Sequence, residues 1–120
     1  MMTQRTVFYV DDNPKAVRML TFALEGSGYK VVTAHNAHEA LERIEPSAFD
    51  LVLLAHRTPK TLGSKLAREI KQVSPGTPII LVSGQTLLAP EELTYVDAYI
   101  GKGATLDSLL AKIRGLIGGK

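Results

Sequence analysis

The 120-residue sequence predicts a single α/β domain built on a doubly wound, five-stranded parallel sheet. Short runs of β-branched and aromatic residues alternate with longer segments whose apolar residues recur at helical spacing. This is the pattern of repeated strand–helix units around a parallel sheet. Two runs, LVLLA at 51–55 and IILVS at 79–83, are largely apolar, which is typical of central strands covered by helices on both faces.

The predicted strands are short segments distributed along the whole chain. They are Thr6–Val10, Lys30–Ala34, Leu51–Ala55, Ile79–Ser83 and Ala98–Gly101. Right-handed crossovers between such strands bring their carboxyl ends to one edge of the sheet. Ligands of doubly wound sheets bind beyond that edge, so the residues directly after each strand are the candidates for function.

Four longer segments have the apolar spacing of amphipathic helices. The stripes are Ala16, Val17, Leu20, Ala23 and Leu24; Ala37, Ala40, Leu41 and Ile44; Leu66, Ile70 and Val73; and Leu106, Leu109, Leu110, Ile113 and Ile117. Asn13 and Asn36 suit the N-cap positions of the first two helices, and Gly118 and Gly119 are a natural stop for the last. Between the last two strands only a short helix over residues 91–95 fits, with Pro90 in its first turn.

Composition narrows the classes of function. A hydrophobic fraction of 45% and a charged fraction of 22% are ordinary for a globular protein, and we expect residues 1–120 to form one domain. The chain has no cysteine, so disulfides and thiolate metal sites are excluded. The apolar run in MMTQRTVFYVDD is too short for a signal peptide or a membrane span, so we expect a cytoplasmic location and no membrane partner. The basic residues behind the net charge of +2 are scattered, and we expect no nucleic-acid binding by this domain.

Polar residues follow four of the five predicted strands. Asp11 and Asp12 come after the first, Ala55 and the segment HRTP end the third, Ser83 ends the fourth, and Lys102 follows the fifth. Adjacent carboxylates on a strand-to-helix turn are suitable ligands for Mg²⁺. A hydroxyl and an ammonium group nearby are suitable donors to phosphoryl oxygens.

The same residues belong to motifs that occur together in one family. The acidic pair, FDLVLLAHRTPKTLG at 49–63, Ser83-Gly84 and AYIGK at 98–102 fall in the order of the receiver domains of two-component response regulators. The chain resembles that family over essentially its whole length. The matching positions are Asp11, Asp12, Pro59, Gly63, Ser83, Tyr99 and Lys102.

The resemblance implies both an architecture and a chemistry. It implies a flavodoxin-like sheet of strand order 2-1-3-4-5 in a three-layer α/β/α arrangement. In the family, two acids bind Mg²⁺, an aspartate of the third strand takes a phosphoryl group from a histidine kinase, and a hydroxyl and a lysine contact that group. Carried over, Asp11 and Asp12 are the metal positions, Ser83 and Lys102 the phosphoryl contacts, and Tyr99 the aromatic residue that changes rotamer on activation. The expected partner is a histidine kinase or another phosphorelay protein.

The chain departs from the family at the phospho-acceptor, which is Ala55 here. A methyl group has no nucleophilic atom, so we expect no phosphorylation at the usual site. With the third carboxylate missing, we expect Asp11 and Asp12 to bind Mg²⁺ weakly or not at all. Adjacent His56 faces the other side of the strand and is not expected to replace the aspartate.

Two smaller departures from the family are visible. Gly103 stands where a proline commonly follows the family's lysine, which removes the usual reason for a cis peptide there, so we expect Lys102 to be held less firmly. The helix expected at 91–95 is short for the family, and we expect this to reshape the surface that receivers use for dimerisation or output. The identity of the partner and the oligomeric state are therefore not predicted.

Simpler interpretations of the same residues stay open. Acids at the start of a helix also stabilise its dipole, and Lys102 can form a structural ion pair with Asp11 or Asp12. Ser83 can bond to backbone at a strand end, and Tyr99 can be a half-buried edge residue. It is the joint arrangement that favours a site.

The sequence favours a receiver-type signalling module of a two-component phosphorelay, not an enzyme, that acts through protein–protein interaction without phosphate at the usual site. One alternative is an ordinary phospho-accepting receiver with an engineered Asp-to-Ala change at Ala55. An alternative of another class is a small-molecule-binding or enzymatic doubly wound domain that uses the same crevice. Against it, DDNPK follows the first strand in place of a glycine-rich phosphate loop.

Overall fold

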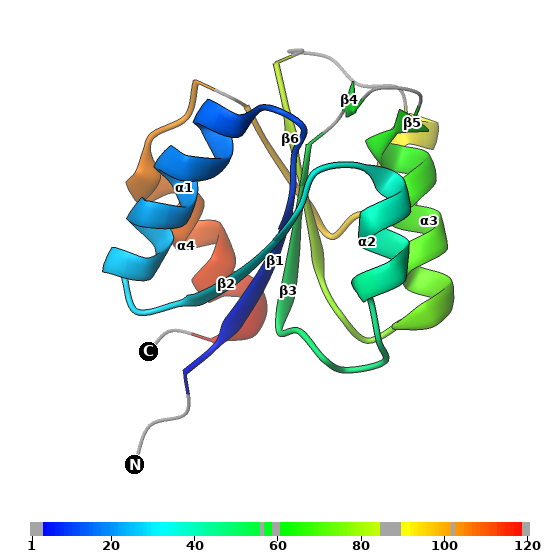
Figure 1. Cartoon of the computed structure of the whole chain (residues 1–120), viewed down its shortest axis with the longest axis horizontal. Helices are drawn as coiled ribbons and strands as arrows, with labels where there is room; N and C mark the ends of the chain where they lie inside the picture. The colour runs from blue at the N-terminus through cyan, green and yellow to red at the C-terminus, as the bar shows by residue number, and fades with distance from the viewer. Residues whose placement is uncertain (1–3, 56, 59–60, 85–89, 102, 119–120) are drawn as a thin grey trace.

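The computed structural model describes residues 4–55, 57–58, 61–84, 90–101 and 103–118 (Figure 1). The strands are β1 (Thr6–Val10), β2 (Lys30–Ala34), β3 (Leu51–Ala55), β4 (Arg57–Thr58), β5 (Thr61–Leu62), β6 (Ile79–Ser83) and β7 (Ala98–Gly101). The helices are α1 (Pro14–Gly26), α2 (Ala37–Arg43), α3 (Gly63–Val73), the 3₁₀ helix η1 (Pro90–Leu93) and α4 (Leu106–Ile117). The five strands predicted from the sequence are confirmed with their bounds.

The main sheet has five parallel strands in the order β2-β1-β3-β6-β7. Counting β6 and β7 as the fourth and fifth strands, this is the predicted order 2-1-3-4-5. The crossovers place α1 and α4 on one face and α2 and α3 on the other, which gives the expected three layers (Figure 1). The short antiparallel pair β4–β5 beyond β3 was not predicted.

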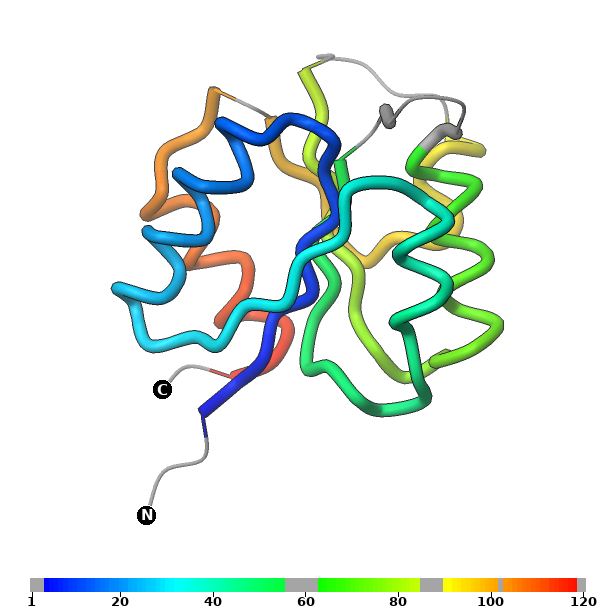
Figure 2. Tube along the Cα trace, viewed as in Figure 1, coloured from blue at the N-terminus to red at the C-terminus, as the bar shows by residue number. Residues whose placement is uncertain are grey.

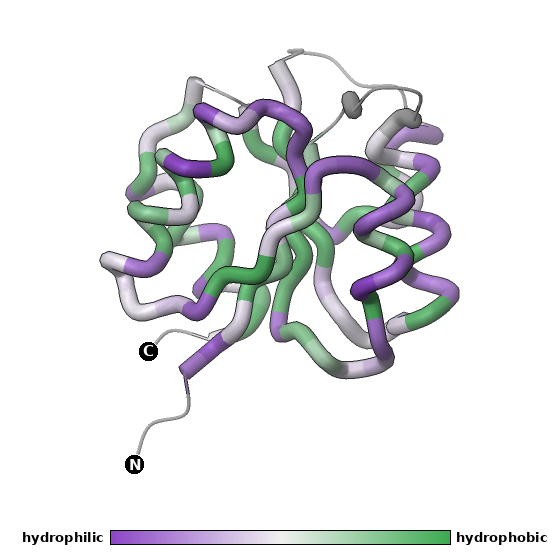
Figure 3. The backbone as a smooth tube through the Cα atoms, in the orientation of Figure 1, coloured by the Kyte–Doolittle hydropathy of each residue, from purple (hydrophilic) through white to green (hydrophobic). Residues whose placement is uncertain are grey.

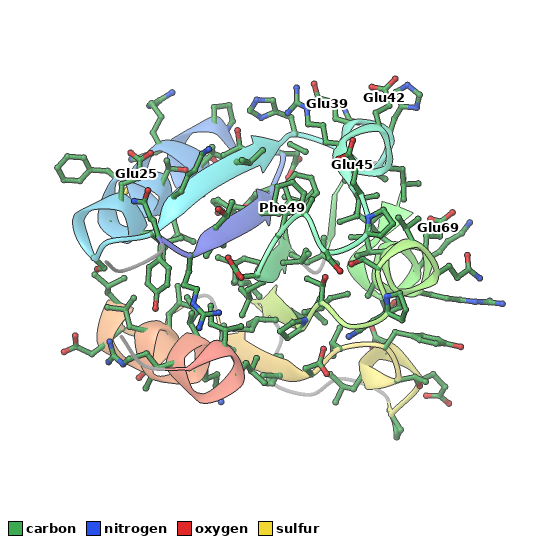
Figure 4. All side chains as sticks on the ribbon, turned by 90° about the horizontal axis from the view of Figure 1, so that it is seen from below. Glu25, Glu39, Glu42, Glu45, Phe49 and Glu69 are labelled. Carbon is green, nitrogen blue, oxygen red and sulfur yellow. The ribbon has the colours of Figure 1, made fainter. Side chains whose placement is uncertain are left out.

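Two apolar clusters fill the spaces between the layers, and the hydropathy colouring shows the strands as their shared apolar centre (Figure 3). The α1/α4 cluster contains Val7, Tyr9, Val17, Leu24, Tyr29, Leu51, Leu53, Ile80, Ile100, Leu109, Leu110 and Ile113. The α2/α3 cluster contains Phe8, Val10, Ala34, Ala40, Ile44, Val52, Leu54, Leu66, Ala67, Ile70, Ile79 and Leu81. The strand β3 is apolar along its whole length because its side chains enter both clusters. Phe49 closes the second cluster by stacking on Phe8, with 4.5 Å between ring centroids (Figure 4).

The predicted helix caps are confirmed. The side chain of Asn13 accepts hydrogen bonds from the amides of Lys15 and Ala16, and that of Asn36 accepts one from Glu39. These bonds satisfy amides that have no partner inside the first turn of a helix. At the other end of the chain, Gly118 ends α4 with a φ of 93°, a conformation that side chains other than glycine rarely adopt.

Two expectations about the helices were wrong in detail. The predicted helix at 91–95 is a single 3₁₀ turn that begins at Pro90, because hydrogen bonds from Thr94 to Glu91 and from Val96 to Leu93 span three residues. Val73 and Leu106 belong to the predicted apolar stripes of α3 and α4, but both are exposed, with relative exposures of 36% and 40%. No described helix is long and apolar enough to span a membrane.

Polar contacts at the amino edge of the sheet fix the starts of the strands. Asp50 accepts a hydrogen bond from the amide of Thr6 at 2.7 Å, and Asp97 accepts one from the amide of Ile79 at 2.8 Å. Lys71 binds the same oxygen of Asp97 at 2.9 Å. The five strands of the main sheet are parallel, so their carboxyl ends lie at the opposite end of the sheet from this amino edge (Figure 2). The site described next is at the carboxyl edge.

Candidate functional site

The candidate site is the carboxyl edge of the four strands β1, β3, β6 and β7. Asp11 and Asp12 follow β1 directly, while Ala55 and Ser83 are the last residues of β3 and β6. These strands are neighbours in the sheet, so Asp11, Asp12, Ala55 and Ser83, which come from separate parts of the sequence, lie at one edge. Lys102, expected to complete the set, lies outside the described residues, as do His56 and Pro59.

Asp11 and Ala55 are neighbours on the same face of the sheet. Val10 of β1 pairs with Leu54 of β3, so the next residue on each strand is Asp11 and Ala55 respectively. Side chains alternate along a strand, which puts both residues on the face of Tyr9 and the α1/α4 cluster. Ala55 is 2% exposed. Any side chain longer than a methyl group at this position would therefore extend beside the carboxylate of Asp11.

The carboxylate of Asp11 is buried and has a donor at each oxygen. The hydroxyl of Tyr9 donates a hydrogen bond to Oδ2 at 2.8 Å, and the backbone N–H of Asn13 donates one to Oδ1 at 3.1 Å. Asp11 is 4% exposed and Tyr9 is 3% exposed. Burial, together with the hydrogen bond to Asp11 and its negative charge, raises the pKa of Tyr9, so the phenol stays protonated and remains a donor.

Asp12 differs from its neighbour, because its side chain is exposed at the start of the turn into α1. Within the described ranges, no group of three or more metal-binding side chains of His, Cys, Asp or Glu is found. The acidic set thus consists of one buried and one exposed carboxylate.

Ser83 and Tyr99 lie on the other face of the sheet. Ser83 is 1% exposed and pairs with Gly101, whereas Tyr99 is half-buried and pairs with Leu81. Alternation along β6 and β7 directs both side chains toward the α2/α3 face, with the side-chain-free Gly101 beside Ser83. Gly63, another family position, is buried at the start of α3. The roles of these residues in phosphoryl contact and switching remain predictions.

Tyr9 was missed when the sequence was considered alone. Its place in a β-strand with apolar neighbours made it resemble an ordinary core residue. The available signal was its spacing, because residues two apart on a strand point to the same face and Tyr9 is two residues before Asp11. The spacing indicates a shared face, and the structure adds that the hydroxyl of Tyr9 reaches the carboxylate of Asp11.

The architecture and the acidic strand ends define the class, a doubly wound α/β domain whose polar residues gather at the carboxyl edge of the sheet. A family model, the response regulator receiver domain, matches residues 7–114. The chain therefore belongs to the response-regulator receiver family, as its motifs predicted.

Individual relatives agree with this assignment. The transcriptional regulatory protein YkoG of Bacillus subtilis is 31% identical over 117 residues, which cover 94% of this chain and 51% of the relative. The alkaline phosphatase synthesis regulator PhoP of the same organism is 32% identical over 81 residues, 68% of this chain and 34% of PhoP. The chain thus spans about half or less of the length of these relatives.

Solved structures show the same fold. The response regulator TrrA of Thermotoga maritima, in complex with Mg²⁺ and BeF, superposes with a TM-score of 0.87 at 29% identity, covering 94% of this chain and 99% of TrrA. A CheY-like receiver domain from Methanospirillum hungatei gives a TM-score of 0.81 at 31% identity, covering 94% and 93% of the two chains.

Proposed function

We propose that this chain is a receiver module that signals through protein–protein contacts and does not take a phosphoryl group at the usual position. The observation that supports this most strongly is Ala55, which ends β3 beside Asp11 with its methyl group buried. Family membership supplies the signalling context, since receiver domains are modules of two-component systems.

The chemical reason concerns the acceptor atom. Aspartyl phosphorylation forms a bond between a carboxylate oxygen and phosphorus, and the side chain of Ala55 has no oxygen. The carboxylate of Asp11, which directly follows the neighbouring strand β1, has both oxygens hydrogen-bonded. A phosphoryl switch works by adding charge that pairs with nearby donors. Without an acceptor oxygen at position 55, this domain cannot receive that charge by phosphorylation at the usual site.

Mg²⁺ binding is proposed to be weak for a related reason. Asp11 and Asp12 are the residues that would hold the ion, which when bound would offset negative charge on phosphoryl oxygens. The lost carboxylate at position 55 would have stood next to Asp11 on the same face. Without it, the protein offers two carboxylates, one of which is buried and already hydrogen-bonded.

The partner is proposed to be a protein, either a histidine kinase or another phosphorelay component, and the domain itself is proposed to have no enzymatic activity. We further propose that it works in the cytoplasm and does not contact nucleic acid. YkoG and PhoP, which are named as transcriptional regulators, are longer than this chain. By analogy, the chain corresponds to the receiver part of such proteins.

Amide NMR spectra test whether the chain can be phosphorylated. Spectra of the chain and of the Ala55→Asp variant would be recorded with Mg²⁺, before and after adding a small-molecule phosphodonor. We expect no donor-dependent change in the chain itself and changes around the ends of β6 and β7 in the variant. Donor-dependent changes of equal size in both proteins would contradict the proposal.

A further inference from the structure

We propose that Tyr9 holds the carboxylate of Asp11 in a metal-free state, so that its hydroxyl competes with a divalent cation for that carboxylate. The inference concerns a residue outside the family's functional positions. It does not depend on whether the chain accepts a phosphoryl group, because it concerns only binding of the ion to the acidic pair.

The contacts of Asp11 show why the competition arises. Oδ2 accepts from the Tyr9 hydroxyl at 2.8 Å, which is short enough for a strong bond to a charged acceptor, and Oδ1 accepts from the amide of Asn13 at 3.1 Å. Both side chains are nearly inaccessible to water. The negative charge of Asp11 is therefore balanced by protein donors and not by solvent.

Breaking this bond costs free energy at Tyr9. Its ring is packed in the α1/α4 cluster, and a buried tyrosine hydroxyl that loses its partner retains the cost of desolvation. A cation at Oδ2 would also face the positive end of the O–H dipole, at a place where burial weakens screening by water. Binding the ion must overcome both costs.

Shape alone does not explain a tyrosine at this position. Phenylalanine fills the same volume in the apolar cluster, so the contribution specific to tyrosine is the hydroxyl and its bond to Asp11. Among the described residues, removing that hydroxyl leaves one donor on the carboxylate, the amide of Asn13. Oδ2 then becomes available to an ion or to one of the ion's water molecules.

The test measures Mg²⁺ affinity by calorimetry and by amide NMR in a matched set of proteins. Tyr9→Phe and Tyr29→Phe would each be made in the Ala55 chain and in the Ala55→Asp background, which supplies a third carboxylate. Tyr29 is a suitable control because it is buried in the same α1/α4 cluster but precedes β2, at the amino edge of the sheet. Circular dichroism would verify that each variant folds.

In the Ala55→Asp background we expect Tyr9→Phe to lower the Kd for Mg²⁺ roughly three- to tenfold, the range set by losing one hydrogen bond to a charged acceptor. Tyr29→Phe should leave the Kd unchanged. A gain in affinity cannot come from damage to the fold, which would weaken binding. The inference is overturned if Tyr9→Phe leaves the Kd unchanged or raises it, if Tyr29→Phe has the same effect, or if no variant binds millimolar Mg²⁺. Failure of the proposed function would appear separately, as phosphoryl uptake by the unaltered chain.

Discussion

Asp11 and Ala55 stand side by side on the same face of the sheet, each one residue beyond the paired Val10 and Leu54. This relationship places a buried methyl group where a second carboxylate would share the environment of the first. Because of this arrangement the site lacks a second buried carboxylate, and an acid introduced at position 55 would lower the free energy of unfolding.

Ala55→Asp should destabilise the domain in the absence of Mg²⁺. A second buried carboxylate beside Asp11 adds desolvation and like-charge repulsion, and we expect a loss of about 2–4 kcal/mol in the free energy of unfolding. Urea denaturation with EDTA measures the loss, and added Mg²⁺ should recover part of it because the ion binds the folded state. Ala55→Asn provides the uncharged control of equal size. Equal losses for Asp and Asn, both insensitive to Mg²⁺, would show that bulk and not charge is responsible.

Thr21→Val should stabilise the domain. The hydroxyl oxygen of Thr21 in α1 is buried and has no hydrogen-bond partner among the described residues. Valine has nearly the same shape and removes the unsatisfied group, so we expect a gain of about 1 kcal/mol in a urea titration.

Thr77→Val is the matched control for that change. The hydroxyl of Thr77 is buried and lies 2.6 Å from the hydroxyl of Ser74, whose oxygen also accepts a hydrogen bond from the amide of Ser47. Here valine leaves a partner unsatisfied, and we expect a loss of about 1–2 kcal/mol. If both threonine variants changed stability in the same direction, hydrogen-bond satisfaction would not be the cause.

Asp97→Ala should loosen the amino edge of the sheet. The same carboxylate oxygen accepts from the amide of Ile79 and from Lys71, so removal leaves a backbone amide without its partner at the start of β6. The ion pair itself is partly exposed and contributes little in water, and the expected loss of about 1–2 kcal/mol comes mainly from the amide. Asp97→Asn, which keeps an acceptor oxygen, should lose less. A Lys71→Met variant as damaging as Asp97→Ala would instead assign the effect to the ion pair.

Glu39 should make stability depend on pH in the acidic range. The amide of His35 donates to its carboxylate at 2.7 Å, and this bond, aided by nearby Arg43, lowers the pKa of Glu39 below its ordinary value of 4.5. Because the folded pKa is lower than the unfolded one, the stabilisation is present above about pH 4.5 and is lost as the pH falls through the folded pKa. The difference in unfolding free energy between the chain and Glu39→Gln should shrink over that range. A difference that does not vary with pH would refute the assignment.

The sequence was most informative where periodicity and burial coincide. The strands were predicted with their bounds because runs such as Leu51–Ala55 are apolar on both faces. The Asn13 and Asn36 caps followed from a residue type that is strongly preferred at the N-cap. Periodicity failed at two helix ends, because Val73 in α3 and Leu106 in α4 continue the apolar spacing but are exposed.

The site was predictable as a set of positions but not as a set of contacts. Strand order brings Asp11, Ala55 and Ser83 to one edge, and that follows from the βα pattern. The bond from Tyr9 to Asp11 depends on how far a buried ring reaches along the strand, which composition and periodicity do not encode. The pair β4–β5 is similarly too short to leave a periodic signal.

Exposed Met19 and Phe22 on α1 also lie outside the periodic pattern, with Phe22 82% exposed.

The most direct test of the central claim is the intact mass of the chain after incubation with Mg²⁺ and a small-molecule phosphodonor, with Ala55→Asp treated in parallel. We predict no added phosphoryl group on the chain and one on the variant, which would mean that the site at the carboxyl edge lacks only the acceptor. A phosphoryl group on the unaltered chain would contradict the account and direct attention to His56, next to the missing acceptor.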